Sequence, residues 1–132
     1  MKYRMKVLFA GICLLFSTLF SCQHKGGDFE SVPVEKFAVL IADPEIQCLD
    51  VRTVAEYSEG HIPGSVNINV LDKEFASVAD SILQKDKPVA VYCRSGKRSK
   101  KAAVILSGKG FKVYDLDRGL AGWQEAGKET EK

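Results

Sequence analysis

The sequence predicts an α/β domain built on a parallel central sheet, and three observations lead to that prediction. Short apolar runs alternate along the chain with stretches of helical periodicity, which is typical of β-α-β units. Two runs, residues 46–51 and 89–92, are almost continuously apolar, as in strands that helices cover on both faces. The length of 132 residues and the 45% hydrophobic content suit a single ordinary core.

The first half of the domain alternates between strands and short helices. The first helix is expected to place Phe37, Leu40 and Ile41 inward. Thr53 precedes the second helix, with Glu56 three residues later as in a capping box. The expected elements are strand 29–32, helix 34–41, strand 46–51, helix 54–58, a turn over 60–64 and strand 66–68.

The second half continues the alternation. Apolar residues at helical spacing predict its first helix, and they are Phe75, Val78, Ala79, Ile82 and Leu83. Gly108 is expected to end the second helix, and Trp123 is expected to pack into the core. The expected elements are helix 73–84, strand 89–92, helix 97–107, strand 111–116 and helix 120–126.

The first 21 residues have the pattern of a secretory signal peptide. Three basic residues precede the apolar run 7–20, which is shorter than the about 20 residues that a spanning helix needs. The run ends in Leu-Phe-Ser-Cys, which is similar to a bacterial lipobox and implies lipidation of Cys22. We therefore expect a signal over 1–21, a polar tether over 22–30 and a domain over 31–132. Cleavage to a free soluble protein and an uncleaved anchor remain as alternatives.

This arrangement predicts an exported protein, lipid-anchored to a bacterial membrane on its periplasmic or outer side. Loss of residues 1–21 changes the net charge from +2 to −1. The stretch from Cys93 to Tyr114 nevertheless has no acidic residue and carries five basic residues between positions 94 and 101. Nucleic-acid binding would call for a broad basic face instead. We expect a small anionic ligand, no nucleic-acid partner and a monomer.

Cysteine usage leaves one thiol for chemistry. The four cysteines are Cys13 in the signal, Cys22 at the lipid site, Cys48 within a strand and Cys93 at a strand end. An exported protein could form a Cys48–Cys93 bridge, but Cys48 is expected to be a packing residue. There is no CxxC, and the histidines lie in a tether and a turn, so we expect no metal site and no cofactor. The turn histidine, His61, is expected to have no catalytic role.

Cys93 follows the apolar strand 89–92, and a helix begins about one turn later. In such a strand-loop-helix arrangement, backbone N–H groups and the positive end of the helix dipole surround the central residue. These surroundings favour the thiolate, which is the nucleophilic form of cysteine. Gly96 allows a positive φ and leaves the mouth of the loop free of a side chain. Because the basic residues of the loop oppose the dipole, a bound anion would compensate them.

Three motifs resemble the signatures of the rhodanese family. Residues 93–98, Cys-Arg-Ser-Gly-Lys-Arg, are similar to its active-site loop, Cys-Arg-x-Gly-x-Arg/Thr. Residues 49–68, with Leu-Asp-Val-Arg at their start and Gly-His-Ile-Pro-Gly later, resemble its first signature. Residues 117–123, Asp-Arg-Gly-Leu-Ala-Gly-Trp, resemble its C-terminal signature. The resemblance implies a three-layer fold with helices on both faces of a five-stranded parallel sheet of order 1-5-4-2-3.

The resemblance also implies a sulfurtransferase with Cys93 as its nucleophile. The thiolate would take the outer sulfur of an anionic donor such as thiosulfate. The resulting persulfide would pass it to a thiophilic acceptor, which is a thiol, cyanide or a protein. Loop N–H groups and cations would bind the donor and the persulfide, and the residues concerned are Arg94, Ser95, Gly96, Lys97, Arg98 and Ser99. Asp50 and Arg52 are expected to form a structural ion pair or loop anchor near the site.

Two other functions remain open. A cysteine-dependent phosphatase needs a Cys-x5-Arg loop, whereas the sixth residue after Cys93 is Ser99 and Arg98 stands one position early. A non-enzymatic rhodanese-like module would carry sulfur or bind a partner, although inactive modules often lack the cysteine. The C-terminal signature usually has two adjacent glycines, and the first is Arg118 here. Arg118 is expected either to add a positive group near the loop or to narrow access to it.

Overall fold

The computed structural model describes residues 28–132. The expected signal peptide and the lipidation site Cys22 lie outside the described residues. The first strand, β1, begins at Phe29, so the last two residues of the expected tether belong to the sheet. None of the helices within residues 28–132 combines the length and the apolar character that a bilayer span requires.

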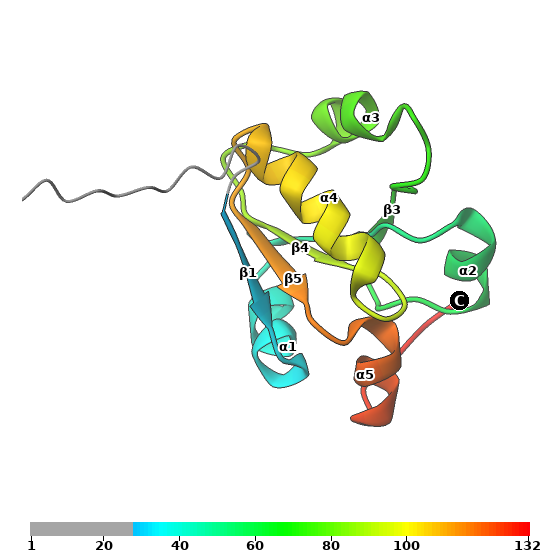
Figure 1. Ribbon diagram of the computed structural model, residues 1–132. Helices are drawn as coiled ribbons and strands as arrows, with labels where there is room; N and C mark the ends of the chain where they lie inside the picture. The colour runs from blue at the N-terminus through cyan, green and yellow to red at the C-terminus, as the bar shows by residue number, and fades with distance from the viewer. Residues whose placement is uncertain (1–27) are drawn as a thin grey trace, which may run out of the picture.

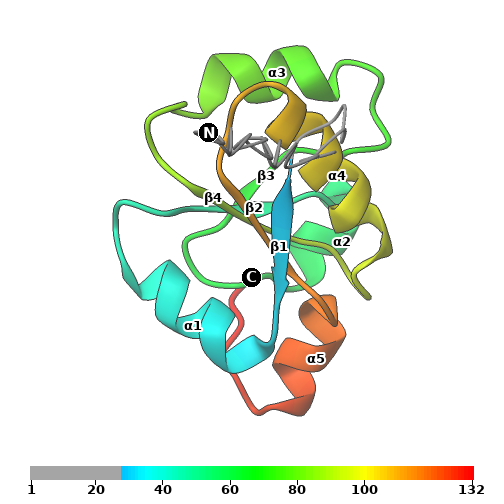
Figure 2. The same ribbon diagram turned by 60° about the vertical axis from the view of Figure 1, so that its left-hand side comes forward.

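Five parallel strands form the central sheet, in the order β1-β5-β4-β2-β3 (Figures 1 and 2). This sheet confirms the predicted fold class and the strand order that the resemblance implied. The strands are β1 Phe29–Val32, β2 Gln47–Asp50, β3 Val66–Asn67, β4 Val89–Tyr92 and β5 Val113–Leu116. Because β4 is the middle strand, the residues that follow it lie centrally at the carboxyl edge of the sheet.

Helices cover both faces of this sheet, which gives three layers (Figure 2). Helices α3 and α4 pack on one face, and α1 and α5 on the other. The short helix α2 directly follows β2. The helices are α1 Val34–Ala42, α2 Val54–Glu59, α3 Phe75–Ile82, α4 Lys97–Gly108 and α5 Gly119–Glu125.

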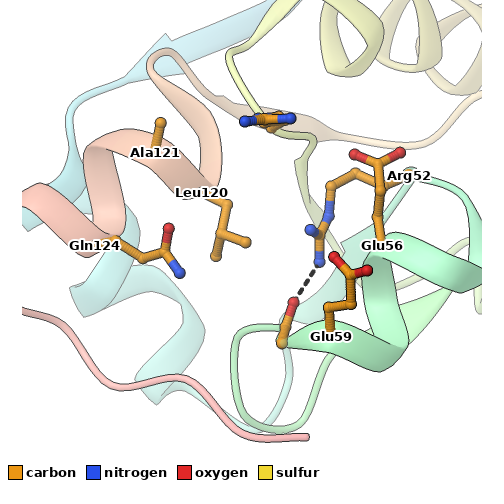
Figure 3. A pocket seen from close by; sticks show the side chains of 8 residues that line it. Arg52, Glu56, Glu59, Leu120, Ala121 and Gln124 are labelled. Carbon is orange, nitrogen blue, oxygen red and sulfur yellow. Dashed lines mark hydrogen bonds between the residues drawn. The ribbon is translucent and has the colours of Figure 1, made fainter.

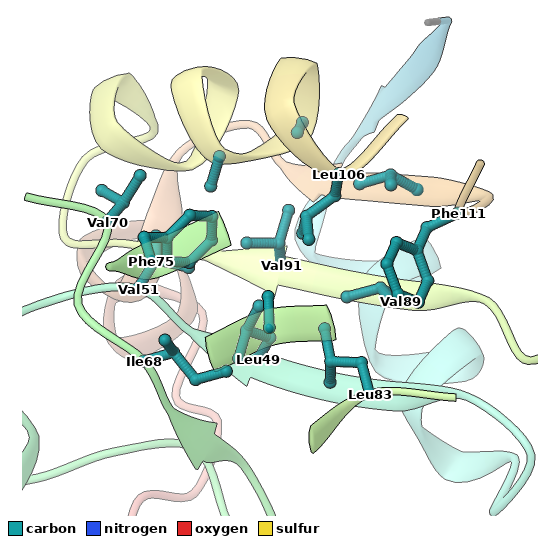
Figure 4. Close-up of a cluster of buried hydrophobic side chains, with 14 of the residues drawn as sticks. Leu49, Val51, Ile68, Val70, Phe75, Leu83, Val89, Val91, Leu106 and Phe111 are labelled. Atoms are coloured by element: carbon teal, nitrogen blue, oxygen red, sulfur yellow. The ribbon is translucent and has the colours of Figure 1, made fainter. Parts of the chain in front are cut away.

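Alternate residues of each strand supply two separate cores. In β4, Val89 and Val91 face α3 and α4, whereas Ala90 and Tyr92 face α1 and α5. All four side chains are buried, which explains why this strand is continuously apolar. Figure 4 shows the first of these cores, with Val91 and Leu106 lying between the sheet and α4.

Several helix details differ from the expectation. The inward side of α3 is made by Phe75 and Ala79, followed by the buried Leu83 directly after the helix, while Val78 and Ile82 are 37% and 51% exposed. Helix α3 packs on the core with one side only, and Val78 and Ile82 lie on its other, solvent-facing side. Helix α4 includes Gly108 as its last residue. The glycine with a positive φ, 97°, is Gly110 in the following turn.

Candidate active site

Cys93 lies at the carboxyl end of β4, buried to 1% exposure against the α4 side of the sheet. The chain turns at Gly96, whose φ is +101°, and α4 starts at the next residue. The turn directs the Gly96 N–H toward the cysteine, and its nitrogen lies 3.1 Å from Cys93 Sγ. The sulfur therefore has a backbone donor at the N-terminal end of a twelve-residue helix, and both stabilise negative charge.

The start of α5 supports this loop from the other side. The N–H groups of Leu120 and Ala121 donate to the carbonyls of Cys93 and Arg94, at 2.8 and 3.0 Å. A side chain on Gly119 would not fit, because its Cβ would lie 2.6 Å from the Cys93 carbonyl oxygen. Gly119, in the C-terminal signature, is thus required because the backbone there approaches the cysteine loop closely.

A buried polar chain continues behind the sulfur. The Cys93 thiol donates to Ser99 Oγ at 3.6 Å, and the Ser99 hydroxyl donates to the fully buried carboxylate of Asp115 in β5. Lys100 Nζ lies 3.0 Å from the Asp115 carboxylate and 3.0 Å from that of Asp117. Ser99 and Lys100 therefore contact the protein interior and the β5 end, not the space in front of the loop.

Arg98 is also bound within the protein. Its guanidinium forms two hydrogen bonds to the Glu56 carboxylate, at 2.7 and 2.8 Å. Glu56 closes the predicted capping box of α2 with Thr53 at the same time. The hydrogen bonds from Arg98 are the main cause that lowers the pKa of Glu56 to about 2. This ion pair joins α2 to α4 across the site.

Asp50 and Arg52 form the buried ion pair that was expected beside the site. Arg52 Nη2 lies 2.6 Å from Asp50 Oδ2 and 2.7 Å from the Gly60 carbonyl oxygen. The pair therefore links the end of β2 to the turn after α2. His61, in that turn, stacks on Tyr57 at a centroid distance of 3.7 Å, and its Nδ1 lies 2.8 Å from the Tyr57 carbonyl. These contacts are those of a structural histidine.

A cavity of about 340 Å³ opens beside the loop, between α5 on one side and α2 with the preceding Arg52 on the other (Figure 3). Leu120, Ala121 and Gln124 form one wall, and Arg52, Glu56 and Glu59 face them. The remaining lining residues are Gly60 and Arg94. Cys93 does not line this cavity, whereas the next residue, Arg94, does. The Cys93 side chain is buried beside it.

The other loop residues face solvent. Arg94, Ser95 and Lys97 are exposed, and neither Arg94 nor Lys97 forms an ion pair within residues 28–132. Arg118 points away from the site, since it pairs with Glu125 at 3.1 Å and borders a separate groove with Pro33. It therefore neither adds charge to the cavity nor narrows it.

Cys48 and Cys93 are both free thiols. Cys48 packs on the α1 and α5 face of the sheet, opposite the face that holds Cys93. Burial is the main cause that raises the pKa of the Cys48 thiol, and the nearby Asp50 adds to it. A neutral thiol of this kind is a poor nucleophile, in keeping with the expected packing role.

The sequence analysis did not predict that Asp115 lies at the site. The sequence held one indication of this position, because Asp115 is the first acidic residue after Cys93 and ends a stretch that contains only basic charges. Its position late in a strand places it at the carboxyl edge of the sheet beside the cysteine loop. Among residues 28–132, no group of three or more side chains is arranged to hold a metal ion.

Residues 33–126 match the family described as the Rhodanese-like domain. The chain belongs to the rhodanese-like family. A rhodanese-related protein from Thermoplasma volcanium has a similar structure, with a TM-score of 0.69 and 31% identity over 78% of this chain and 98% of that one.

Two relatives that are similar to this chain carry different functional names. A thiosulfate sulfurtransferase GlpE from Shewanella oneidensis is 33% identical over 74% of this chain and 95% of its own length. A tRNA uridine(34) hydroxylase from Pelagibacter ubique is 38% identical over 84% of this chain. This chain spans only 37% of that hydroxylase.

Proposed function

We propose that this rhodanese-like protein is a sulfurtransferase that moves a sulfane sulfur through a Cys93 persulfide. The observation that carries the proposal is the contact between the Gly96 N–H and Cys93 Sγ at the start of α4. This geometry supplies a thiolate with a backbone donor, as nucleophilic catalysis by cysteine requires. Relatives named sulfurtransferase support the reaction class, and one of them has nearly the length of this domain.

The donor is an anion such as thiosulfate. The Cys93 thiolate attacks its outer sulfur, a new S–S bond forms, and sulfite leaves with the electron pair of the broken S–S bond. A thiophilic acceptor then takes the outer sulfur, and the Cys93 thiolate is restored. Arg94 and Lys97 are the free cations nearest in sequence to the sulfur, and they bind the sulfonate end of the donor.

The contacts of Arg98 weigh against phosphatase chemistry. A phosphatase arginine must clamp the phosphoryl oxygens, but Nη1 and Nη2 of Arg98 are both bound to the Glu56 carboxylate. The position where such a loop carries arginine is Ser99, which is buried and bound to Asp115. The loop therefore suits one transferred sulfur atom better than a phosphoryl group.

The acceptor is a thiol, cyanide or a protein, and no cofactor takes part. A cavity of about 340 Å³ beside the loop has room for a small acceptor or for a protruding side chain. One relative is named a putative sulfur carrier protein, so a non-enzymatic carrier function is the second candidate. Repeated turnover separates the two, because a carrier takes up sulfur without releasing it to a small thiol.

Intact mass measurement after treatment with thiosulfate tests the proposal. The wild-type protein should gain one sulfur atom on Cys93 and release it to cyanide over many turnovers. Cys93→Ser should gain none, because an alkoxide is not accessible at neutral pH. Cys48→Ser is the matched control and should still be loaded. If hydrolysis of a phosphate ester exceeds sulfur transfer in the same preparation, the assignment is wrong.

A further inference from the structure

The buried carboxylate of Asp115 takes no direct part in the proposed sulfur transfer. Its three donors come from two different elements. Ser99 donates to Oδ1, Lys100 Nζ lies 3.0 Å from Oδ2, and the Ser31 hydroxyl in β1 donates to Oδ2 at 2.8 Å. Burying a carboxylate is costly unless donors surround it, and here the donors fix both of its oxygens. The Ser99 hydroxyl alone separates this carboxylate from the Cys93 sulfur.

Ser99 lies between this carboxylate and Cys93. A hydroxyl has one proton to donate and two lone pairs that accept. An ionised carboxylate can only accept, so the Ser99 proton points at Asp115. Ser99 consequently turns a lone pair toward Cys93 Sγ, 3.6 Å away, and accepts from the thiol. The Gly96 carbonyl, 3.2 Å from Ser99 Oγ, is the other acceptor within reach.

We propose that Asp115 is a positioning residue that acts through Ser99 and keeps the serine proton away from the Cys93 sulfur. The thiolate then has the Gly96 N–H as its donor but no hydroxyl donor. A thiolate that is stabilised tenfold reacts about threefold more slowly, since nucleophilicity changes with a Brønsted coefficient of about 0.4–0.5. By withholding one hydrogen bond, Asp115 keeps the sulfur more reactive. The role of Asp115 in sulfur transfer rests on the proposed function. Its effect on the reactivity of the Cys93 thiolate does not depend on that function.

Asp115→Asn should reverse the direction of the serine proton. Lys100 can only donate, so the amide oxygen of the asparagine should face Lys100 and Ser31. The amide NH₂ then faces Ser99 and donates to it, which releases the serine proton. The charged sulfur is a stronger acceptor than the Gly96 carbonyl, so Ser99 should now donate to the thiolate.

Alkylation of Cys93 by iodoacetamide measures this effect without any sulfur donor. On the high-pH plateau of the rate, Asp115→Asn should react about threefold more slowly than wild type. In thiosulfate turnover the same variant should lose about threefold in kcat with an unchanged KM, because Arg94 and Lys97 are untouched. Every protein compared should also carry Cys48→Ala, so that Cys93 is the one thiol within residues 28–132 that iodoacetamide can label.

The double variant distinguishes action through Ser99 from a general effect of charge or packing. In a Ser99→Ala background, Asp115→Asn should leave the alkylation rate within about twofold. Equal slowing in both backgrounds would overturn the proposal. If Asp115→Asn does not fold, the alkylation rate of Ser99→Ala alone tests whether Ser99 donates to the Cys93 sulfur. Its alkylation rate should stay near that of wild type, whereas a threefold gain would mean that Ser99 already donates to the sulfur. Failure of wild-type sulfur transfer would refute only the proposed function.

Discussion

Four of the basic side chains that follow Cys93 fall into two groups according to their partners. Arg98 and Lys100 are bound to carboxylates of the protein itself. Arg94 and Lys97 are exposed and form no ion pair within the part of the chain that the structure describes. Sequence spacing could not separate the groups, because Glu56 lies 42 residues before Arg98. Only the second group is free to bind an anionic donor.

Removal of either free cation should weaken donor capture. Arg94→Ala and Lys97→Ala should raise the thiosulfate KM more than they lower kcat, which is the pattern of lost ground-state binding. Each change should cost about tenfold in kcat/KM, the lower end for a charge-assisted hydrogen bond, because both side chains are exposed. Steady-state kinetics with thiosulfate and cyanide measure the effect. Lys112→Ala, at the opposite end of β5 from the site, is the control. Wild-type KM values in both variants would exclude the donor-binding role.

At the scale of elements, the loop after β4 depends on the start of α5. Gly119 has a φ of +60°, and an added Cβ would lie 2.6 Å from main-chain atoms of both Cys93 and Arg94. Gly127 has a similar φ of +72° but no neighbour within 4 Å of an added Cβ. The two glycines therefore share the backbone requirement and differ in the steric one.

This difference makes a controlled comparison. Gly127→Ala should cost about 1 kcal/mol of unfolding free energy, the usual penalty for a left-handed backbone. Gly119→Ala should cost about 1–3 kcal/mol more, because the overlap must displace the Cys93 loop. It should also lower kcat, since the Gly96 N–H would move relative to the sulfur. Urea unfolding and kinetics on both variants measure these effects. Equal stability and activity in the two variants would show that α5 does not hold the loop.

The ion pair between α2 and α4 predicts a pH dependence of stability. The pKa of Glu56 is lowered from its ordinary 4.5 to about 2, chiefly by the hydrogen bonds from Arg98. A lowered carboxyl pKa stabilises the fold fully above about pH 4.5, and the contribution is lost as the pH falls toward 2. Glu56→Gln removes the charge and keeps the capping box, which glutamine also forms.

Unfolding free energies of wild type and Glu56→Gln should therefore differ by about 1 kcal/mol between pH 5 and 7. The difference should shrink below pH 4.5 and approach zero near pH 2, while other carboxyl groups titrate equally in both proteins. Urea unfolding across this pH range measures it. A difference that stays constant down to pH 2 would contradict the ion-pair interpretation.

Local patterns predicted the elements well, and longer-range geometry accounts for what they missed. The strands β2 and β4 and the capping box at Thr53 follow from apolar runs and cap spacing. Val78 and Ile82 are exposed because α3 contacts the core through Phe75 and Ala79, and spacing alone did not show which of the apolar residues would face inward.

At the scale of the whole molecule, the strand order creates the site. Placing β5 between β1 and β4 brings Ser31, Asp115 and Ser99 together from three elements. The resemblance supplied this strand order, and composition and periodicity alone would not have done so. The loop residues were therefore predictable as a group, but their division into donor-binding and internally bound side chains needed the tertiary structure.

The N-terminal segment predicts where the whole protein resides. We propose that lipid on Cys22 anchors it to the periplasmic or outer side of a bacterial membrane, because a basic start and a short apolar run precede a lipobox-like stretch. When the full chain is expressed in a bacterial host, Cys22→Ser should lose the mass of the lipid and leave the membrane fraction. A single acyl chain binds membranes only marginally, so stable partition of wild type would require more than one chain on Cys22.

Cys13→Ser is the matched control, since it changes a cysteine within the apolar run that precedes Cys22 and leaves the predicted lipid site intact. It should keep the processing, mass and membrane partition of wild type. Fractionation followed by intact mass measurement distinguishes a lipidated protein, an uncleaved anchor and a cleaved soluble protein. If the processed Cys22→Ser protein stays in the membrane fraction and differs in mass from wild type only by the substitution itself, the lipid is excluded. Unprocessed wild-type protein would indicate an uncleaved anchor. Wild-type protein in the soluble fraction would indicate ordinary signal cleavage. The thiosulfate-dependent gain of one sulfur should be equal in both variants, because Cys93 and the side chains proposed to bind the donor are unchanged in them.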